Sequence, residues 1–111
     1  MLKKEVLRKK DDFDRIYKKG KSIGDKYVVV FFQKNDLPYN RTAFLASKKV
    51  GNSVQRNRAK RLMRESFRLM EGEIKTGYDF IIIARKSILG CKMEEVKESI
   101  ERAMKKGKRF R

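Results

Sequence analysis

The apolar residues near the start of the chain follow the period of an α-helix. Three of them have the i, i+3, i+4 spacing of one helix face: Phe13, Ile16 and Tyr17. This spacing predicts a helix over residues 11–19. Asp11 or Asp12 is expected to cap its free N–H groups, and Gly20 is expected to end it.

Two segments rich in β-branched and aromatic residues predict strands that are covered on both faces. They are residues 26–34 (KYVVVFFQK) and residues 78–85 (YDFIIIAR). A turn at Pro38 and a third strand over residues 41–47 suggest an antiparallel hairpin with the first segment. Residues 22–23 are expected to add a short edge strand.

Two further helices are predicted over residues 54–70 and 93–106, the first with Asn52 or Ser53 as its N-cap. The longer helix has one apolar stripe, which is expected to face the core: Ala59, Leu62, Met63, Phe67, Leu69 and Met70. The order of elements predicts an α/β (α+β) two-layer sandwich with three helices and a mixed sheet of about four strands.

The charge of the chain indicates a polyanionic partner. Lys and Arg total 31 against 14 Asp and Glu, a formal net charge of +17, in 111 residues that suit a single domain over residues 1–111. Nucleic acid is the first candidate, an anionic membrane surface the second and an acidic protein the third. Residues 1–8 and 107–111 are expected to fray, with weak phosphate contacts from the basic tail.

The apolar runs do not favour a membrane protein. The longest, residues 27–32, is far shorter than the roughly 20 residues that span a bilayer. The N-terminus has no apolar segment typical of a secretory signal, and a single cysteine, Cys91, excludes an intramolecular disulfide. We therefore expect no membrane contact and a cytoplasmic protein.

The absence of histidine excludes imidazole-based catalysis and histidine-ligated metal sites. Carboxylate chemistry remains an alternative, because Asp11, Asp12 and Asp14 cluster near the start. Such clusters more often cap helices or lie in solvent, so we expect neither a catalytic residue nor a protein-bound metal or cofactor.

The segment from Lys48 to Arg68, KKVGNSVQRNRAKRLMRESFR, carries eight basic residues and one acid, Glu65. At about 100° per residue, Asn57, Arg61 and Arg64 fall opposite the apolar stripe. Acidic partners at i,i+4 are nearly absent, so the basic residues repel one another unless phosphates lie between them. Arginine forks and the helix N-terminus both suit phosphate oxygens, which indicates binding of RNA or DNA.

The order and spacing of SKKVGNSVQRNRAKRLMRE closely resemble the signature of the bacterial ribonuclease P protein component, with Arg56-Asn57-Arg58 as its central element. LRKKDDFDRIYKKGKS near the start and DFIIIARK extend the resemblance over most of the chain. One departure is Ala43, where the family typically has glycine.

The resemblance implies a left-handed βαβ crossover and a noncatalytic role in an endoribonuclease that matures tRNA. An RNA subunit would hold Mg²⁺ and remove the 5′ leader from precursor tRNA, with one protein per RNA. The residues implied to bind the catalytic RNA are Lys48, Lys49, Asn52, Arg56, Asn57, Arg58, Lys60, Arg61, Arg64 and Arg68. Those implied to form a cleft for the single-stranded leader are Lys9, Phe13, Tyr17, Tyr27, Val29 and Phe31.

Core packing is the competing interpretation for Phe13 and Phe31, because spacing alone does not separate core from cleft. Two other functions compete for the whole chain. One is a structural RNA-binding protein, such as a ribosomal protein, and the other is a self-sufficient carboxylate–metal nuclease.

Overall fold

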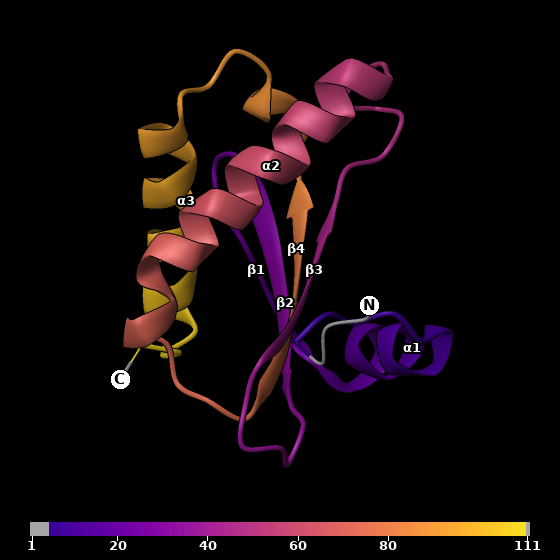
Figure 1. Cartoon of the computed structure of the whole chain (residues 1–111), viewed down its shortest axis with the longest axis vertical. Helices are drawn as coiled ribbons and strands as arrows, with labels where there is room; N and C mark the ends of the chain where they lie inside the picture. Colours follow the sequence, from indigo (N-terminus) through magenta and orange to yellow (C-terminus); the bar gives the residue numbers. More distant parts are fainter. Residues whose placement is uncertain (1–4, 111) are drawn as a thin grey trace.

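A mixed four-stranded sheet organises residues 5–110, the part of the chain that the computed structural model describes. The elements are α1 (Lys10–Lys19), β1 (Lys21–Gly24), β2 (Val28–Lys34), β3 (Arg41–Leu45), α2 (Ser53–Met70), η1 (Glu71–Glu73), β4 (Tyr78–Ala84), η2 (Lys86–Ile88) and α3 (Met93–Lys106). α2 and α3 lie on one side of the sheet, and α1 lies on the other (Figure 1). The expected fold class is confirmed, as are the edge strand β1 and both bounds of α3.

Strand β4 lies between β2 and β3, so the antiparallel hairpin expected from the turn at Pro38 is wrong. The strand order is β1-β2-β4-β3, with β4 antiparallel to β2 and parallel to β3. Residues 80–82 of β4 are fully buried, and a strand with apolar residues on both faces is most stable in a central position. α2 is therefore the crossover between two parallel strands, and its left-handed sense stays a prediction.

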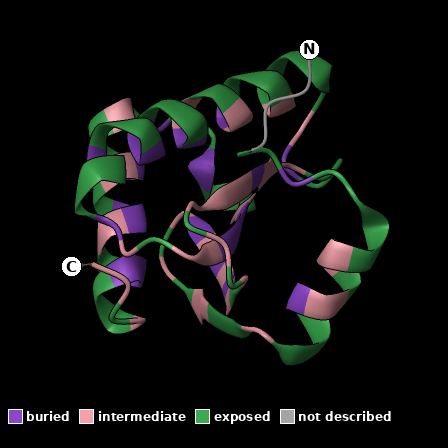
Figure 2. Ribbon diagram, turned by 60° about the horizontal axis from the view of Figure 1, so that its bottom comes forward, coloured by how far each residue is buried: buried purple, intermediate pink, exposed green. Residues whose placement is uncertain are grey.

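The main core lies between the sheet and the pair α2 and α3 (Figure 2). β2 contributes every second side chain to this core, namely Val28, Val30 and Phe32, and the side chains between them point to the opposite face of the sheet. α2 contributes Ala59, Met63, Phe67 and Met70. Leu69, also expected in the core, is 52% exposed. Ser66 is buried on that side of the helix instead, and its hydroxyl donates to the Leu62 carbonyl at 2.7 Å.

α1 packs on the opposite face of the sheet through Ile16, which is fully buried. Its partners there form a second, smaller cluster: Leu7, Ala43 and Ile81. The N-cap residue is Lys9, so the cap expected at Asp11 or Asp12 is wrong, and both carboxylates lie inside the first turn. Anionic side chains are stabilised in that turn by the helix dipole. Gly20 is confirmed as the residue that ends the helix.

Both ends of the described chain are paired, where fraying was expected. Leu7 is buried and donates its N–H to the Thr42 carbonyl at 2.9 Å. Near the other end, the Lys75 N–H donates to the Arg109 carbonyl at 2.8 Å, and Phe110 forms a β-bridge with Ile74. Residues 1–4 and 111 lie outside the described part. Within that part, none of the helices has the length and apolarity that crossing a membrane requires.

Candidate nucleic-acid interface

A capping box fixes the start of α2, directly before its first arginine. The Asn52 side-chain oxygen accepts the Gln55 N–H at 2.9 Å, and the Gln55 side chain accepts the Asn52 N–H at 2.9 Å. Asn52 rather than Ser53 is therefore the cap. Gly51 has φ of 151°, and a Cβ there would lie 2.0 Å from the Gln55 side-chain oxygen, so only glycine fits this turn.

The basic residues of α2 face solvent, as helical phasing predicts. Eight of the residues expected to bind RNA are exposed: Lys48, Lys49, Asn52, Asn57, Arg58, Arg61, Arg64 and Arg68. Arg56 and Lys60 are partly buried. None of these cations forms an ion pair within the described residues. We call this set the α2 basic face. Its uncompensated charge favours an anionic ligand.

Two arginines of this face are already oriented by the protein. Arg56 donates to the Gly51 carbonyl at 3.0 Å and to the Ser53 hydroxyl at 3.3 Å, which places its guanidinium over the start of α2. Arg58 donates to the Cys91 carbonyl at 3.4 Å, toward the loop before α3. Cys91 itself is buried.

Three aromatic rings meet between α1 and β2. The ring centroids of Phe13 and Tyr17 are 6.4 Å apart, and those of Tyr17 and Phe31 are 5.1 Å apart in an edge-to-face arrangement. Tyr17 is 42% exposed, and its partial burial raises the pKa of its hydroxyl. Val29 lies on the same strand face as Phe31, and Lys9 precedes Phe13 by one helical turn. We call these five residues the aromatic cleft, after the cleft that the sequence resemblance implies for them.

Tyr27 was expected in this cleft, but the structure places it on the other face of the sheet. It precedes β2, packs against the main core and donates its hydroxyl to Glu95 of α3 at 3.3 Å. Its backbone N–H donates to the Ser99 hydroxyl at 3.2 Å. The alternation of side chains applies only within a strand, and Tyr27 lies one residue outside β2.

A row of half-buried apolar residues continues the aromatic cleft across the sheet. Val29 is paired in register with Ile83, and Ile83 with Leu45, one row beyond the residues covered by Ile16. At the β3 edge, a cavity of about 420 Å³ is lined by residues that include Phe13, Leu45 and Arg64. One residue of the aromatic cleft, Phe13, and one of the α2 basic face, Arg64, thus line the same cavity.

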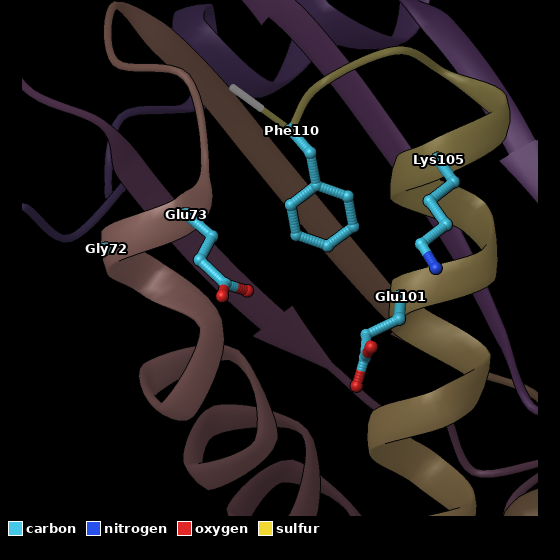
Figure 3. A pocket seen from close by; sticks show the side chains of 5 residues that line it. All are labelled: Gly72, Glu73, Glu101, Lys105 and Phe110. Atoms are coloured by element: carbon cyan, nitrogen blue, oxygen red, sulfur yellow. The ribbon is translucent and has the colours of Figure 1, made fainter.

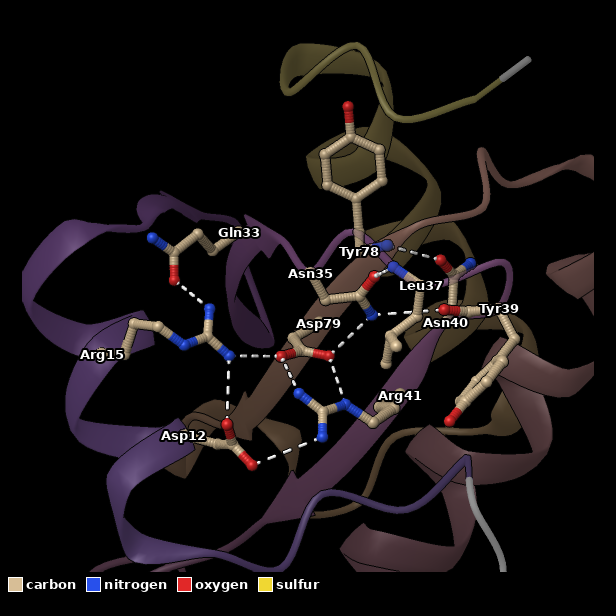
Figure 4. A network of polar contacts seen from close by, with 10 residues as sticks. All are labelled: Asp12, Arg15, Gln33, Asn35, Leu37, Tyr39, Asn40, Arg41, Tyr78 and Asp79. Atoms are coloured by element: carbon tan, nitrogen blue, oxygen red, sulfur yellow. Dashed lines mark hydrogen bonds and ion pairs between the residues drawn. The ribbon is translucent and has the colours of Figure 1, made fainter.

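A buried polar network holds α1 against the sheet beside this cleft (Figure 4). The fully buried Asp79 of β4 accepts hydrogen bonds from Arg41 at 2.8 and 2.7 Å, from Arg15 at 2.6 Å and from Asn35 at 2.9 Å. Burial alone would raise the pKa of Asp79, but the hydrogen bonds from Arg41, Asn35 and Arg15 hold it below its usual value. Asp12 of α1 pairs with both arginines.

Sequence reasoning missed this network, because its members come from α1, β3, β4 and the loop after β2. Asp12 was considered only as a helix cap or a catalytic carboxylate. A charged residue in a buried strand, Asp79 in YDFIIIA, was the one available signal, since buried charges require partners.

Another cavity, of about 520 Å³, lies between η1 and α3, away from both surfaces (Figure 3). It is lined by Gly72, Glu73, Glu101, Lys105 and Phe110. The carboxylates of Glu73 and Glu101 point into it, and they repel phosphate, so it does not suit an RNA backbone.

The fold and its surfaces define a small α/β nucleic-acid-binding protein, with a basic helix beside an aromatic sheet face. The chain belongs to the ribonuclease P protein family, because the family model described as Ribonuclease P matches residues 1–108. It is thus an RNA-binding component of a tRNA-processing ribonucleoprotein.

Individual relatives agree with this family. The ribonuclease P protein component of Alkaliphilus metalliredigens is 48% identical over 104 residues, which cover 94% of this chain and 90% of the relative. The RNase P protein of Staphylococcus aureus has a similar structure, with a TM-score of 0.88 and 35% identity over 98% of this chain and 100% of that one. For the Thermotoga maritima RNase P protein the TM-score is 0.84, with 36% identity over 93% and 97% of the two chains.

Proposed function

We propose that this protein assists a catalytic RNA in removing the 5′ leader from precursor tRNA, and that it uses a separate surface for each RNA. The α2 basic face binds the catalytic RNA, and the aromatic cleft binds the single-stranded leader. The observation that carries this proposal is the cavity shared by Phe13 of the cleft and Arg64 of α2. It makes the two surfaces neighbours, as they must be if the leader emerges beside the catalytic RNA.

The α2 basic face suits a folded RNA. Arg61, Arg64 and Arg68 are exposed at one-turn intervals and have no ion-pair partner within residues 5–110. Each guanidinium can grip a phosphate with two parallel hydrogen bonds. The capping box holds the first turn in place before RNA arrives, so little ordering of the backbone is needed on binding.

The aromatic cleft suits an unpaired strand. Tyr17 presents an exposed ring whose position is held by Phe13 and Phe31. Bases can stack on such rings in any sequence, each for about 1–3 kcal/mol. Lys9, at the start of α1, supplies a cation for the backbone between bases.

In this proposal the protein binds and orients RNA, and the catalytic RNA performs cleavage with the Mg²⁺ that it holds. One protein acts with one RNA in the cytoplasm. The alternative of a carboxylate nuclease receives no support from Asp12, whose carboxylate pairs with Arg15 and Arg41. Asp11 and Asp14 are exposed on α1.

Reconstitution with the catalytic RNA tests the proposal. At low Mg²⁺, the protein should accelerate leader removal by the RNA and should cleave nothing alone. Cleavage by the protein alone that is abolished in Asp11→Ala or Asp14→Ala would instead establish a carboxylate nuclease. RNA binding without any stimulation of cleavage would leave a structural RNA-binding protein.

A further inference from the structure

We infer that a third site, a basic pocket where α1 ends, binds a phosphate of an RNA backbone. The pocket has a volume of about 170 Å³ and lies outside the α2 basic face and the aromatic cleft. Its cations and aromatic walls are Lys19, Lys21, Lys34, Arg109, Phe32 and Tyr78. The inference goes beyond the proposed function, because it requires only that the protein binds RNA.

The fold brings these cations together from three stretches of the chain: residues 19–21, the end of β2 and the segment after α3. Gly20 is pressed against β2, since a Cβ there would lie 2.8 Å from the Phe32 carbonyl oxygen and 2.5 Å from that of Ile16. Lys19 and Lys21 on either side of it are therefore held at the sheet edge. Lys21 is paired in register with Phe32, and Lys34 lies two residues further along β2.

Arg109 is oriented for a ligand by the two aromatic rings. Its guanidinium carbon lies 5.0 Å from the Phe32 ring centroid and 4.5 Å from that of Tyr78, a cation–π arrangement on both. Its Nε donates to the Gly107 carbonyl at 2.8 Å. In the described chain, its two terminal nitrogens have no hydrogen-bond partner, so their N–H groups remain available to an anion.

The pocket lining contains four cations and no acid. Lys34 approaches Asp36 at 3.9 Å, but both side chains are mostly exposed, and such a pair contributes little. The dipole of α1 stabilises a lysine at its C-terminal end, which explains the position of Lys19 but not those of the other three cations. Lys21, Lys34 and Arg109 lie on other elements and repel one another, and a bound phosphate would relieve that repulsion.

The position of the pocket indicates how RNA reaches it. Phe32 and Tyr78 of the pocket pack with the core on the α2 and α3 side of the sheet, whereas Tyr17 and Phe31 of the aromatic cleft meet on the α1 side, so the pocket lies around the end of α1 from the cleft. A single strand whose bases stack in the cleft reaches the pocket only by passing around the end of α1, at Lys19 and Gly20. The same phosphodiester chemistry could also come from the catalytic RNA, and the experiment separates these two sources.

The test compares two double variants that each remove two positive charges. Lys19→Gln/Lys34→Gln changes the pocket, and Lys105→Gln/Lys106→Gln changes exposed lysines of α3 that do not line it. Dissociation constants are measured against salt for the catalytic RNA, and for the reconstituted holoenzyme with precursor tRNA carrying a short or a long leader. The pocket variant should lower the slope of log K against log salt by about 0.7 for each single-strand phosphate that the protein no longer binds.

A change in slope only for the precursor with the long leader would mean that the pocket binds a phosphate of the leader. A change in slope only for the isolated catalytic RNA would mean that the pocket binds a phosphate of that RNA. Unchanged slopes for every RNA, or an equal change in the α3 variant, would overturn the inference. These outcomes are independent of the proposed function. Failure of that function would appear as a wild-type protein that binds RNA without stimulating cleavage.

Discussion

Arg41 and Asp79 form a two-pronged ion pair between neighbouring parallel strands, with the carboxylate fully buried. Nε of Arg41 donates to Oδ1 at 2.8 Å and Nη2 donates to Oδ2 at 2.7 Å. Arg15 of α1 joins the same carboxylate, so one buried charge fixes both the edge strand β3 and the helix that carries the aromatic cleft. The network is therefore part of the fold, and it also holds in position the helix on which the aromatic cleft depends.

Asp79→Asn should lower the free energy of unfolding by up to about 3–5 kcal/mol, because it removes the buried partner of Arg41 and Arg15 and leaves them only their longer contacts to Asp12. Urea unfolding measures the difference. Asp36→Asn is the control, because its carboxylate is exposed, and it should change stability by less than about 0.5 kcal/mol. Equal effects of the two substitutions would contradict the role assigned to Asp79.

A second carboxylate links the turn before β2 to α3 and makes stability depend on pH. Asp25 accepts hydrogen bonds from Arg102 at 2.8 Å and from Ser99 at 2.7 Å. Burial alone would raise the pKa of Asp25, but these hydrogen bonds lower it to about 2. Its unfolded value is near 3.9. The folded state therefore binds this proton less readily, and the stabilisation is complete above about pH 4 and disappears as the pH falls toward 2.

The difference in unfolding free energy between the wild type and Asp25→Asn should accordingly be largest above pH 4 and shrink between pH 4 and 2. Taking the difference removes the contribution of Asp79, which titrates in both proteins. Urea unfolding at closely spaced pH values measures it, and a difference that stays constant with pH would refute the assignment.

Local patterns predicted the elements well and their partners poorly. α3 has the predicted bounds, because its apolar period and its first-turn carboxylates are local properties. The partner of β3 was wrong, since a short turn at Pro38 favours a hairpin only when no better strand competes. β4 competes through residues 80–82, which need cover on both faces, and periodicity does not encode that choice.

The candidate site shows the same difference between local features and contacts over long sequence distances. The outward orientation of Arg61 and Arg64 follows from helical phase alone, and it is confirmed. Tyr27 was assigned to the wrong face, because strand alternation was extended one residue past the start of β2. The Asp79 network and the pocket at Arg109 join segments far apart in the sequence, so no local pattern reveals them.

Asn52→Ala should lower the free energy of unfolding by about 1 kcal/mol, because it removes the side-chain acceptor for the Gln55 N–H at the start of α2. Asn57→Ala is the matched control. Asn57 is exposed inside the helix and alanine is a better helix former, so its stability should stay equal or rise. Thermal melting of the RNA-free protein measures both. Equal destabilisation by the two substitutions would mean that the capping box does not hold the first turn.

Arg61→Ala should weaken binding of the catalytic RNA and reduce the slope of log K against log salt by about 0.9 for each phosphate that the side chain neutralises. The side chain is exposed on the α2 basic face, so the fold should be unaffected. Lys106→Ala is the control, because it removes a positive charge from an exposed position of α3, and it should leave the slope unchanged. A slope that Arg61→Ala does not alter would mean that this residue faces away from the RNA.

Tyr17→Ala should weaken binding of precursor tRNA by about 1–3 kcal/mol in the holoenzyme, because it removes the exposed ring on which a leader base stacks. Tyr27→Phe is the comparison. It removes a hydroxyl that contacts Glu95 on the opposite face of the sheet and should leave the affinity unchanged. A tRNA that lacks the leader should bind the holoenzyme with the same affinity whether it contains either variant or the wild-type protein. Reduced affinity in Tyr27→Phe, with none in Tyr17→Ala, would place the leader on the α3 side of the sheet.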